Sequence, residues 1–247
     1  MTIAQRLGDD GFAIVPFDPE VARWSEAALH VAVQIIERGT GRRHGGTWFA
    51  GVDALPNSKD GSIAGVPFGG AWLETVPQPV HWHKAQLSAV FPGYPRQDID
   101  ESDAAHRFRR DRDAAHVDGL LPEGPQKRRH LREPHAFIAG LPLTTVAASP
   151  LVVWKGSHHV MGAAFRKAFA GISPNRWPDV DVTKIYQAAR TSVFNDCPRV
   201  KVQATPGEVI LLHRHLVHGV APWGNSTETD ARIVAYFRPL MSFRDWL

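Results

Sequence analysis

The tripeptide His116-Val117-Asp118 places an imidazole and a carboxylate two residues apart in a run of small and apolar residues. In an extended strand, side chains at i and i+2 point to the same face. One histidine and one carboxylate on one face supply two of the three ligands of a facial-triad iron site. A polar pair on the solvent side of a sheet has the same sequence, so the tripeptide indicates a metal only together with further residues.

A third ligand has to come from a distant strand, and three histidines qualify. His213, His215 and His218 follow the apolar segment 207–212, and Gly219 is small enough to let another ligand approach His218. Along one strand, His213 and His215 would point to the same face and His218 to the opposite face, unless a β-bulge lies between them. The residues alone leave the choice among the three histidines open.

Arg232 lies fourteen residues after His218, at the start of the apolar segment 233–237. A metal site that chelates 2-oxoglutarate through its oxo and C1 carboxylate oxygens must neutralise the far carboxylate, and a planar guanidinium does so with two parallel hydrogen bonds. Arg232 is predicted to fill this role. The alternative is an arginine on the surface of a strand.

The elements that must position these residues are short strands and a few helices. Helical spacing of apolar residues, with Asp18 as the cap and Gly39 as the stop, predicts a helix over 19–38. Two further helices are expected, one with Ser157 as its cap and Gly171 as its stop, and one over 181–194. Short apolar or alternating segments predict strands at 85–91, 135–143, 151–154, 199–205, 207–213 and 231–239.

This order of elements favours a mainly β fold with flanking helices, a β-sandwich or jelly roll. A doubly wound α/β sheet is the competing fold, and it would need a regular alternation of strands and helices. The sequence lacks the glycine-rich loops GxGxxG and GxxxxGK[ST] that would support a nucleotide site in such a sheet. The 247 residues suffice for a single domain over 1–247.

Composition narrows the class of protein. The net charge is +3, and from Arg96 to Arg132 nine Lys or Arg stand against eight Asp or Glu, so no unbalanced basic stripe for nucleic acid is expected. The uncharged stretch 136–154 contains two prolines and reads as strand, turn, strand rather than as a membrane span. One cysteine, Cys197, and the acidic N-terminal residues 9–10 favour a cytoplasmic protein.

Several motifs stand in the order found in one known family. They are "LGDDGFAIV" near the start, "AQLSAVFPGYP", "HVD" at 116–118, "GSH" at 156–158, "LVHGVAPWGNS" and "ARIVAYFRP". From about residue 7 to residue 239, the chain thereby resembles the phytanoyl-CoA dioxygenase-like family of iron(II)- and 2-oxoglutarate-dependent oxygenases. That family folds as a double-stranded β-helix, a jelly roll with the metal between its two sheets.

The resemblance implies a set of site residues and cofactors. His116, Asp118 and His218 are expected to bind iron(II), and Arg232 is expected to hold the far carboxylate of 2-oxoglutarate. Gln86 and His135 correspond to positions that contact the cosubstrate, although His135 departs from the small hydroxyl residue expected there. The implied cofactors and cosubstrates are iron(II), 2-oxoglutarate and O2.

The predicted activity is hydroxylation of a small organic substrate with release of succinate and CO2. Because Asp118 is a carboxylate rather than a small residue, hydroxylation is expected rather than halogenation. The alternatives are a cupin-like metalloenzyme that does not use 2-oxoglutarate and a non-catalytic ligand-binding jelly roll.

Loops are expected at 95–112 and 121–135, with an acidic substrate bound by one or two of Arg128, Arg129 and Arg132. A solvated rim of salt bridges is the alternative for these arginines.

Overall fold

The computed structural model describes residues 1–79 and 81–247. Its helices are α1 Ile3–Asp9, α2 Pro19–Arg38, α3 Asp103–Asp111, α4 Ser157–Ala168 and α5 Thr183–Asp196, with 3-10 turns η1 Ala71–Thr75, η2 Pro174–Asp179 and η3 Phe243–Trp246. Its strands are β1 Phe12–Val15, β2 Arg42–Arg43, β3 Trp48–Gly51, β4 Gln86–Val90, β5 Leu120–Glu123, β6 Arg128–Leu131, β7 Phe137–Pro142, β8 Leu151–Trp154, β9 Arg199–Val202, β10 Val209–His213, β11 His218–Val220 and β12 Arg232–Phe237.

The strands form two larger sheets and a hairpin. A seven-stranded sheet has the order β1-β10-β7-β12-β4-β3-β2, a three-stranded sheet has the order β11-β8-β9, and β5 pairs with β6. Ile138 and Ile210 of the large sheet pack with Leu151 and Val153 of the small sheet, so the two sheets meet face to face. The chain is therefore mainly β with flanking helices, and its two packed sheets are consistent with a jelly roll that does not close into a barrel.

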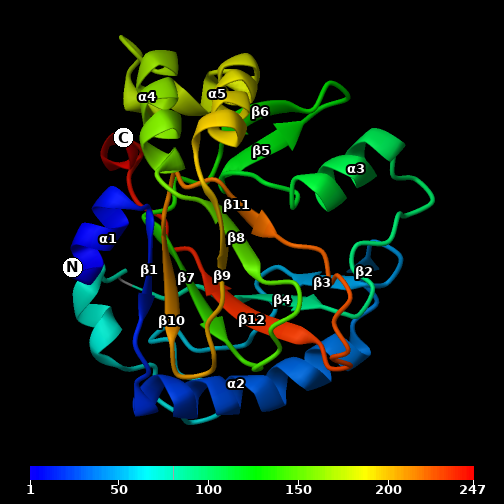
Figure 1. Ribbon diagram of the computed structural model, residues 1–247. Coiled ribbons are helices and arrows are strands. Elements are labelled where there is room, and N and C mark those ends of the chain that lie inside the picture. The colour runs from blue at the N-terminus through cyan, green and yellow to red at the C-terminus, as the bar shows by residue number, and fades with distance from the viewer. Residues whose placement is uncertain (80) are drawn as a thin grey trace.

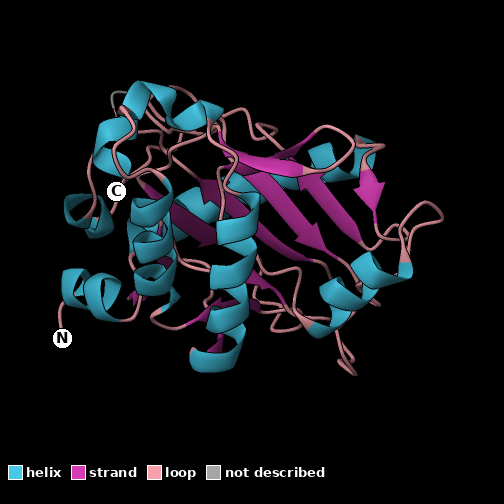
Figure 2. Cartoon of the chain, turned by 90° about the horizontal axis from the view of Figure 1, so that it is seen from above, coloured by secondary structure: helices cyan, strands magenta, loops and turns pink. Residues whose placement is uncertain are grey.

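Helix α2 covers the other face of the large sheet. Its buried residues Val21, Trp24, Ala28, Ala32 and Ile36 recur at helical spacing and join one core cluster with the strand residues on that face. Figure 1 shows α2 running across one side of the strands, and Figure 2 shows helices around the periphery of the central strands. The opposite face packs on the small sheet through apolar residues such as Ile138 and Ile210, and it also carries the polar Gln86 and Ser88.

The predicted elements agree with the structure in most places. Helix α2 begins after the Asp18 cap as predicted, with the Asp18 carboxylate accepting from the Glu20 N–H at 2.8 Å. Stretch 136–154 is strand, turn, strand, as β7 and β8. Helix α4 differs in detail: Gly156 in the left-handed conformation is its cap, and the Ser157 hydroxyl instead accepts from the Val217 N–H at 2.9 Å.

The prediction of loops on either side of residues 116–118 was wrong in two places. Residues 103–111 form α3, capped by Ser102, and residues 120–131 form the β5–β6 hairpin. Helix α3 has no buried residue, and the hairpin is largely polar, so neither carries the apolar periodicity by which such elements are detected. No helix among the described residues has both the length and the apolar character needed to cross a bilayer.

Candidate metal centre

Three ligand-type side chains converge between the two sheets. His116 and His218 form an antiparallel bridge, with His116 N–H donating to the His218 carbonyl at 2.9 Å and the reverse bond at 3.0 Å. Asp118 Oδ1 lies 3.0 Å from His116 Nε2 and 3.8 Å from His218 Nε2. One ligand atom from each residue lies within 4.8 Å of the others, and within residues 1–79 and 81–247 no other His, Cys, Asp or Glu group meets this criterion.

Backbone contacts set the orientation of both imidazoles. His116 Nδ1 lies 2.9 Å from the Ala114 carbonyl, and His218 Nδ1 lies 2.9 Å from the Leu216 carbonyl. A carbonyl accepts but does not donate, so each Nδ1 carries a proton, and Nε2 is the nitrogen of each ring that can bind a metal. Two imidazole nitrogens and a carboxylate oxygen facing one point are a donor set that suits a divalent transition metal such as iron(II).

Gly219 allows the two ligand segments to approach. A Cβ on Gly219 would lie 2.1 Å from the Asp113 carbonyl oxygen and 3.3 Å from Ala115 Cα. The backbone of 113–116 therefore lies directly against β11, where Val220 N–H donates to the Asp113 carbonyl at 3.0 Å. This close packing brings His116 and Asp118 to the strand that carries His218.

The three groups differ in proton affinity. Burial opposes ionisation of Asp118, but its hydrogen bond with His116 and the charges of His218, His116 and Arg238 hold its pKa well below the ordinary 3.8. Burial opposes protonation of His116, yet the hydrogen bond and charge of Asp118 raise its pKa. Burial, with His116 and Arg238 nearby, lowers the pKa of His218 to about 4 although Asp118 opposes this shift.

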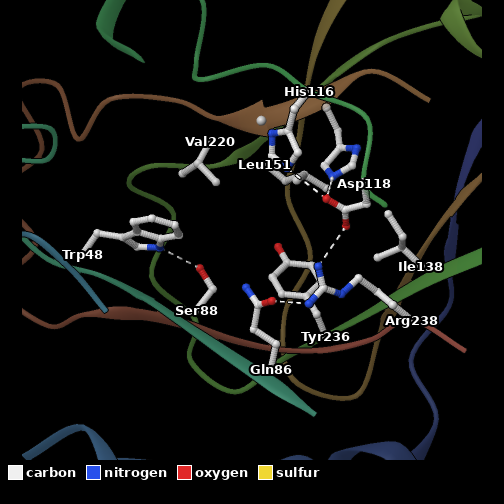
Figure 3. Close-up of a pocket in the computed structure, with 12 residues that line it drawn as sticks. Trp48, Gln86, Ser88, His116, Asp118, Ile138, Leu151, Val220, Tyr236 and Arg238 are labelled. Carbon is white, nitrogen blue, oxygen red and sulfur yellow. Dashed lines mark hydrogen bonds and ion pairs between the residues drawn. The ribbon is translucent and has the colours of Figure 1, made fainter. Parts of the chain in front are cut away.

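Arg238 also faces the triad, although it was not among the predicted site residues. Its Nη1 donates to Asp118 Oδ2 at 3.3 Å, and its Nη2 donates to Gln86 Oε1. Figure 3 shows Asp118 between His116 and Arg238, with the Gln86 amide beside the guanidinium. The sequence held a signal for this residue, because Arg238 lies just beyond β12 and has the same strand parity as Arg232 and Tyr236.

A cavity of about 130 Å³ adjoins the triad. Apart from the triad and Arg238, its wall is mostly apolar or aromatic, with the polar Gln86 and Ser88 on β4. The lining residues are Trp48, Gln86, Ser88, His116, Asp118, Ile138, Leu151, His218, Gly219, Val220, Tyr236 and Arg238. Such a wall suits a small organic molecule held beside a metal.

The structure places the three predicted cosubstrate residues differently. Gln86 lines the cavity, but its amide oxygen is paired with Arg238. His135 does not line it: its Nδ1 lies 3.1 Å from the Arg238 carbonyl, and its Nε2 lies 3.2 Å from Glu133. Arg232 is buried at the first position of β12, opposite Val90, and is not a lining residue. Its Nη1 is buried without a hydrogen-bond partner among the described residues.

The other candidate histidines and arginines lie away from the triad. His213 ends β10, and His215 packs against Trp246 with ring centroids 4.3 Å apart, so neither joins the triad. Arg128 pairs with Asp181 at 2.6 Å, Arg132 binds Glu123 with two hydrogen bonds, and Arg129 donates to the Leu120 carbonyl at 2.8 Å. Arg128 and Arg132 are thus held in ion pairs and Arg129 by a backbone carbonyl, and binding of an acidic substrate by these arginines stays a prediction.

Comparisons with known proteins support the fold. No family model matches the sequence, and no curated protein matches it. Among solved structures, the non-heme alpha-ketoglutarate-dependent carbocyclase SnoK from nogalamycin biosynthesis is 14% identical with a TM-score of 0.51, over 96% of this chain and 83% of SnoK. EvdMO1 is 17% identical with a TM-score of 0.51, over 96% of this chain and 49% of EvdMO1. The chain shares the fold of these proteins.

Proposed function

We propose that the chain is an iron(II)- and 2-oxoglutarate-dependent oxygenase that hydroxylates a small organic substrate, with release of succinate and CO2. The observation that carries this proposal is the His116, Asp118 and His218 cluster, whose ligand atoms face one point beside a small cavity. Three protein ligands leave coordination positions free on the metal. The fold shared with SnoK, a protein described as alpha-ketoglutarate-dependent, adds support, since alpha-ketoglutarate is 2-oxoglutarate.

The chain's own residues would bind and shield the reacting groups. Iron(II), when bound with 2-oxoglutarate and O2, supplies the oxidising chemistry. His116 and His218 offer neutral nitrogens, and Asp118 stays ionised over the physiological pH range because its pKa is low. Ile138, Leu151 and Val220 in the cavity wall exclude water from one side of the site.

Arg232 is the proposed partner of the far carboxylate of 2-oxoglutarate. A buried guanidinium needs a paired anion, and the Arg232 Nη1 is buried without a hydrogen-bond partner among residues 1–79 and 81–247. Arg232 is the first residue of β12, and Arg238 follows its last residue. Side chains alternate along a strand, so the two arginines lie on the same face of β12, at its opposite ends. The order of motifs further supports membership in the phytanoyl-CoA dioxygenase-like family.

The decisive experiment mixes the purified protein with iron(II) and 2-oxoglutarate without oxygen. We expect a visible metal-to-ligand charge-transfer band, and succinate release once oxygen and a substrate are supplied. Arg232→Ala should weaken 2-oxoglutarate binding strongly, whereas Arg176→Ala, at an exposed arginine in η2, should not. Absence of both the band and 2-oxoglutarate binding would contradict the proposal. Metal binding without any effect of Arg232→Ala would favour a cupin-like metalloenzyme.

Two finer features of the reaction belong to the proposal. Asp118 supplies a carboxylate ligand, so we expect hydroxylation rather than halogenation, and a chlorinated product from the wild-type protein would contradict this. The apolar part of the cavity wall favours an apolar, C–H-bearing part of the substrate near the metal. Screening small organic molecules for stimulated succinate release identifies the substrate.

A further inference from the structure

We propose that Arg238 is a positioning residue that makes Asp118 a one-oxygen ligand of the metal. This inference rests on the proposed metal site but concerns a residue outside the triad. Asp118 divides its two oxygens between different neighbours. Oδ1 lies 3.0 Å from His116 Nε2 and 3.8 Å from His218 Nε2, whereas Oδ2 accepts from Arg238 Nη1 at 3.3 Å.

This division of contacts determines how many positions the carboxylate occupies on the ion. A free carboxylate can bind a metal through one oxygen or both. With Oδ2 held by a guanidinium, only Oδ1 lies near the two Nε2 atoms. One-oxygen binding leaves an additional position for a chelating cosubstrate and O2, which two-oxygen binding would occupy.

Arg238 is itself fixed on both main-chain and side-chain atoms. Its backbone N–H donates to His83 Nε2 at 2.6 Å, and its carbonyl lies 3.1 Å from His135 Nδ1. Gln86 Oε1 accepts from its Nη2. These contacts give a structural role to Gln86 and His135, because both hold the arginine that holds Asp118. Outer-shell partners of this kind orient the ligands of many metal sites.

A purely structural ion pair is the competing explanation, and the chain offers a matched control for it. Arg109 binds Glu101 with hydrogen bonds of 3.2 and 3.1 Å, and the two side chains are 20% and 9% exposed. Neither residue is a metal ligand or lines the cavity. Arg109→Gln therefore removes a guanidinium–carboxylate pair of comparable burial while leaving the triad and the 113–116 segment intact.

The test titrates the full chain with Co(II), without 2-oxoglutarate or oxygen, and records both the Kd and the visible d–d spectrum. Arg238→Gln should raise the Kd for Co(II) by about 10- to 100-fold and change the spectrum, because Asp118 is free to bind through both oxygens. Arg238→Lys should restore part of the affinity, since an ammonium can also donate to Oδ2. Arg109→Gln should lower the Tm and leave the Kd and spectrum unchanged.

Each outcome separates the two proposals. Wild-type Kd and spectrum in Arg238→Gln would overturn the role of Arg238 while the oxygenase proposal stands. A wild-type protein that binds no Co(II) at the triad would overturn both. If Arg238→Gln does not fold, the variant Gln86→Leu is measured in its place. This variant removes one hydrogen-bond partner of Arg238, so the Kd for Co(II) should also rise, by a smaller factor. An unchanged Kd and spectrum in Gln86→Leu would then contradict the inference.

Discussion

His116 and His218 carry the same ring and share the same type of Nδ1 contact, yet they bind protons differently. Burial lowers the proton affinity of both rings. Asp118 Oδ1 is 3.0 Å from His116 and 3.8 Å from His218. The hydrogen bond and charge of Asp118 therefore outweigh the effect of burial on the pKa of His116, but the charge does not outweigh it at His218. The pKa of His116 is raised, and that of His218 is lowered to about 4. In the metal-free site, His116 therefore binds a proton more tightly than His218 does.

This difference predicts the pH dependence of metal binding. A metal needs a neutral His116, so binding releases a proton at any pH below the raised pKa of that ring. Affinity should rise with pH by up to about tenfold per pH unit in that range and level off above it. His218 and Asp118 are already unprotonated above about pH 5 and add no second proton. Calorimetric titrations in buffers of different ionisation enthalpy count the protons, and a release of two would contradict this assignment.

The identity of the distal ligand gives a second prediction at this scale. Alanine at His116, Asp118 or His218 should abolish metal binding or turnover, because each supplies one of three ligand atoms. Alanine at His213 or His215 should preserve much of both, since these rings lie outside the triad. Two measurements test this: the metal content of each variant after dialysis, and its rate of succinate release. A variant His218→Ala that still turns over, beside an inactive His215→Ala, would show that the ligand was chosen wrongly.

Among the elements, β11 has the greatest influence on the site despite its three residues. It pairs with β8 on one side, and the backbone of 113–116 lies against it on the other. The absence of a side chain at Gly219 permits this approach. The positions of His116 and Asp118 relative to His218 therefore depend on the backbone contacts between β11 and residues 113–116.

Gly219→Ala tests this dependence. A Cβ placed 2.1 Å from the Asp113 carbonyl cannot be accommodated without moving backbone, so we expect a loss of stability of about 1–3 kcal/mol and weaker metal binding. Gly41→Ala is the control, because a Cβ there meets no atom within 4 Å. Chemical denaturation and metal titration measure both effects. Unchanged metal affinity in Gly219→Ala would mean that the contact does not set the ligand spacing.

At the scale of the whole molecule, a second group of histidines lies apart from the triad. His213 and His215 are packed near α4 and the C-terminal turn, in a region with two arginines, Arg166 and Arg214. Burial, together with neighbouring histidines and arginines, lowers the pKa of His213 to about 3 and that of His215 to about 2. Both rings are therefore neutral in the folded protein at any ordinary pH.

Folding stability should consequently fall as the solution is acidified. In the unfolded chain these histidines take up protons near pH 6.5, whereas in the folded chain they do not, so the unfolded state gains protons as pH falls below 6.5. At pH 5 the effect for His215 alone is about 2 kcal/mol. The variant His215→Phe should show a shallower decline of the unfolding free energy between pH 7 and 5. An equally steep decline would rule out His215 as a source of the acid sensitivity.

The sequence by itself determined the elements whose residues repeat with a clear period. Helix α2, the strands β4, β7, β8, β10 and β12, and the mainly β class follow from local apolar spacing and caps, which depend on neighbours in the chain. His116 and Asp118 could also be paired from the sequence, because a spacing of two residues suffices to place side chains on one face. Helix α3 and the β5–β6 hairpin were missed because polar elements lack that spacing.

Only the tertiary structure decided which distant residues meet. His218 reaches His116 through a backbone bridge that strand parity could not reveal, because β10 ends at His213 and β11 begins a new strand. Arg238 reaches Asp118 across 120 positions of sequence, and His135 turns to the Arg238 backbone rather than to the cavity. Contacts of this kind depend on how two sheets pack, and packing is a property of the whole chain rather than of any local segment.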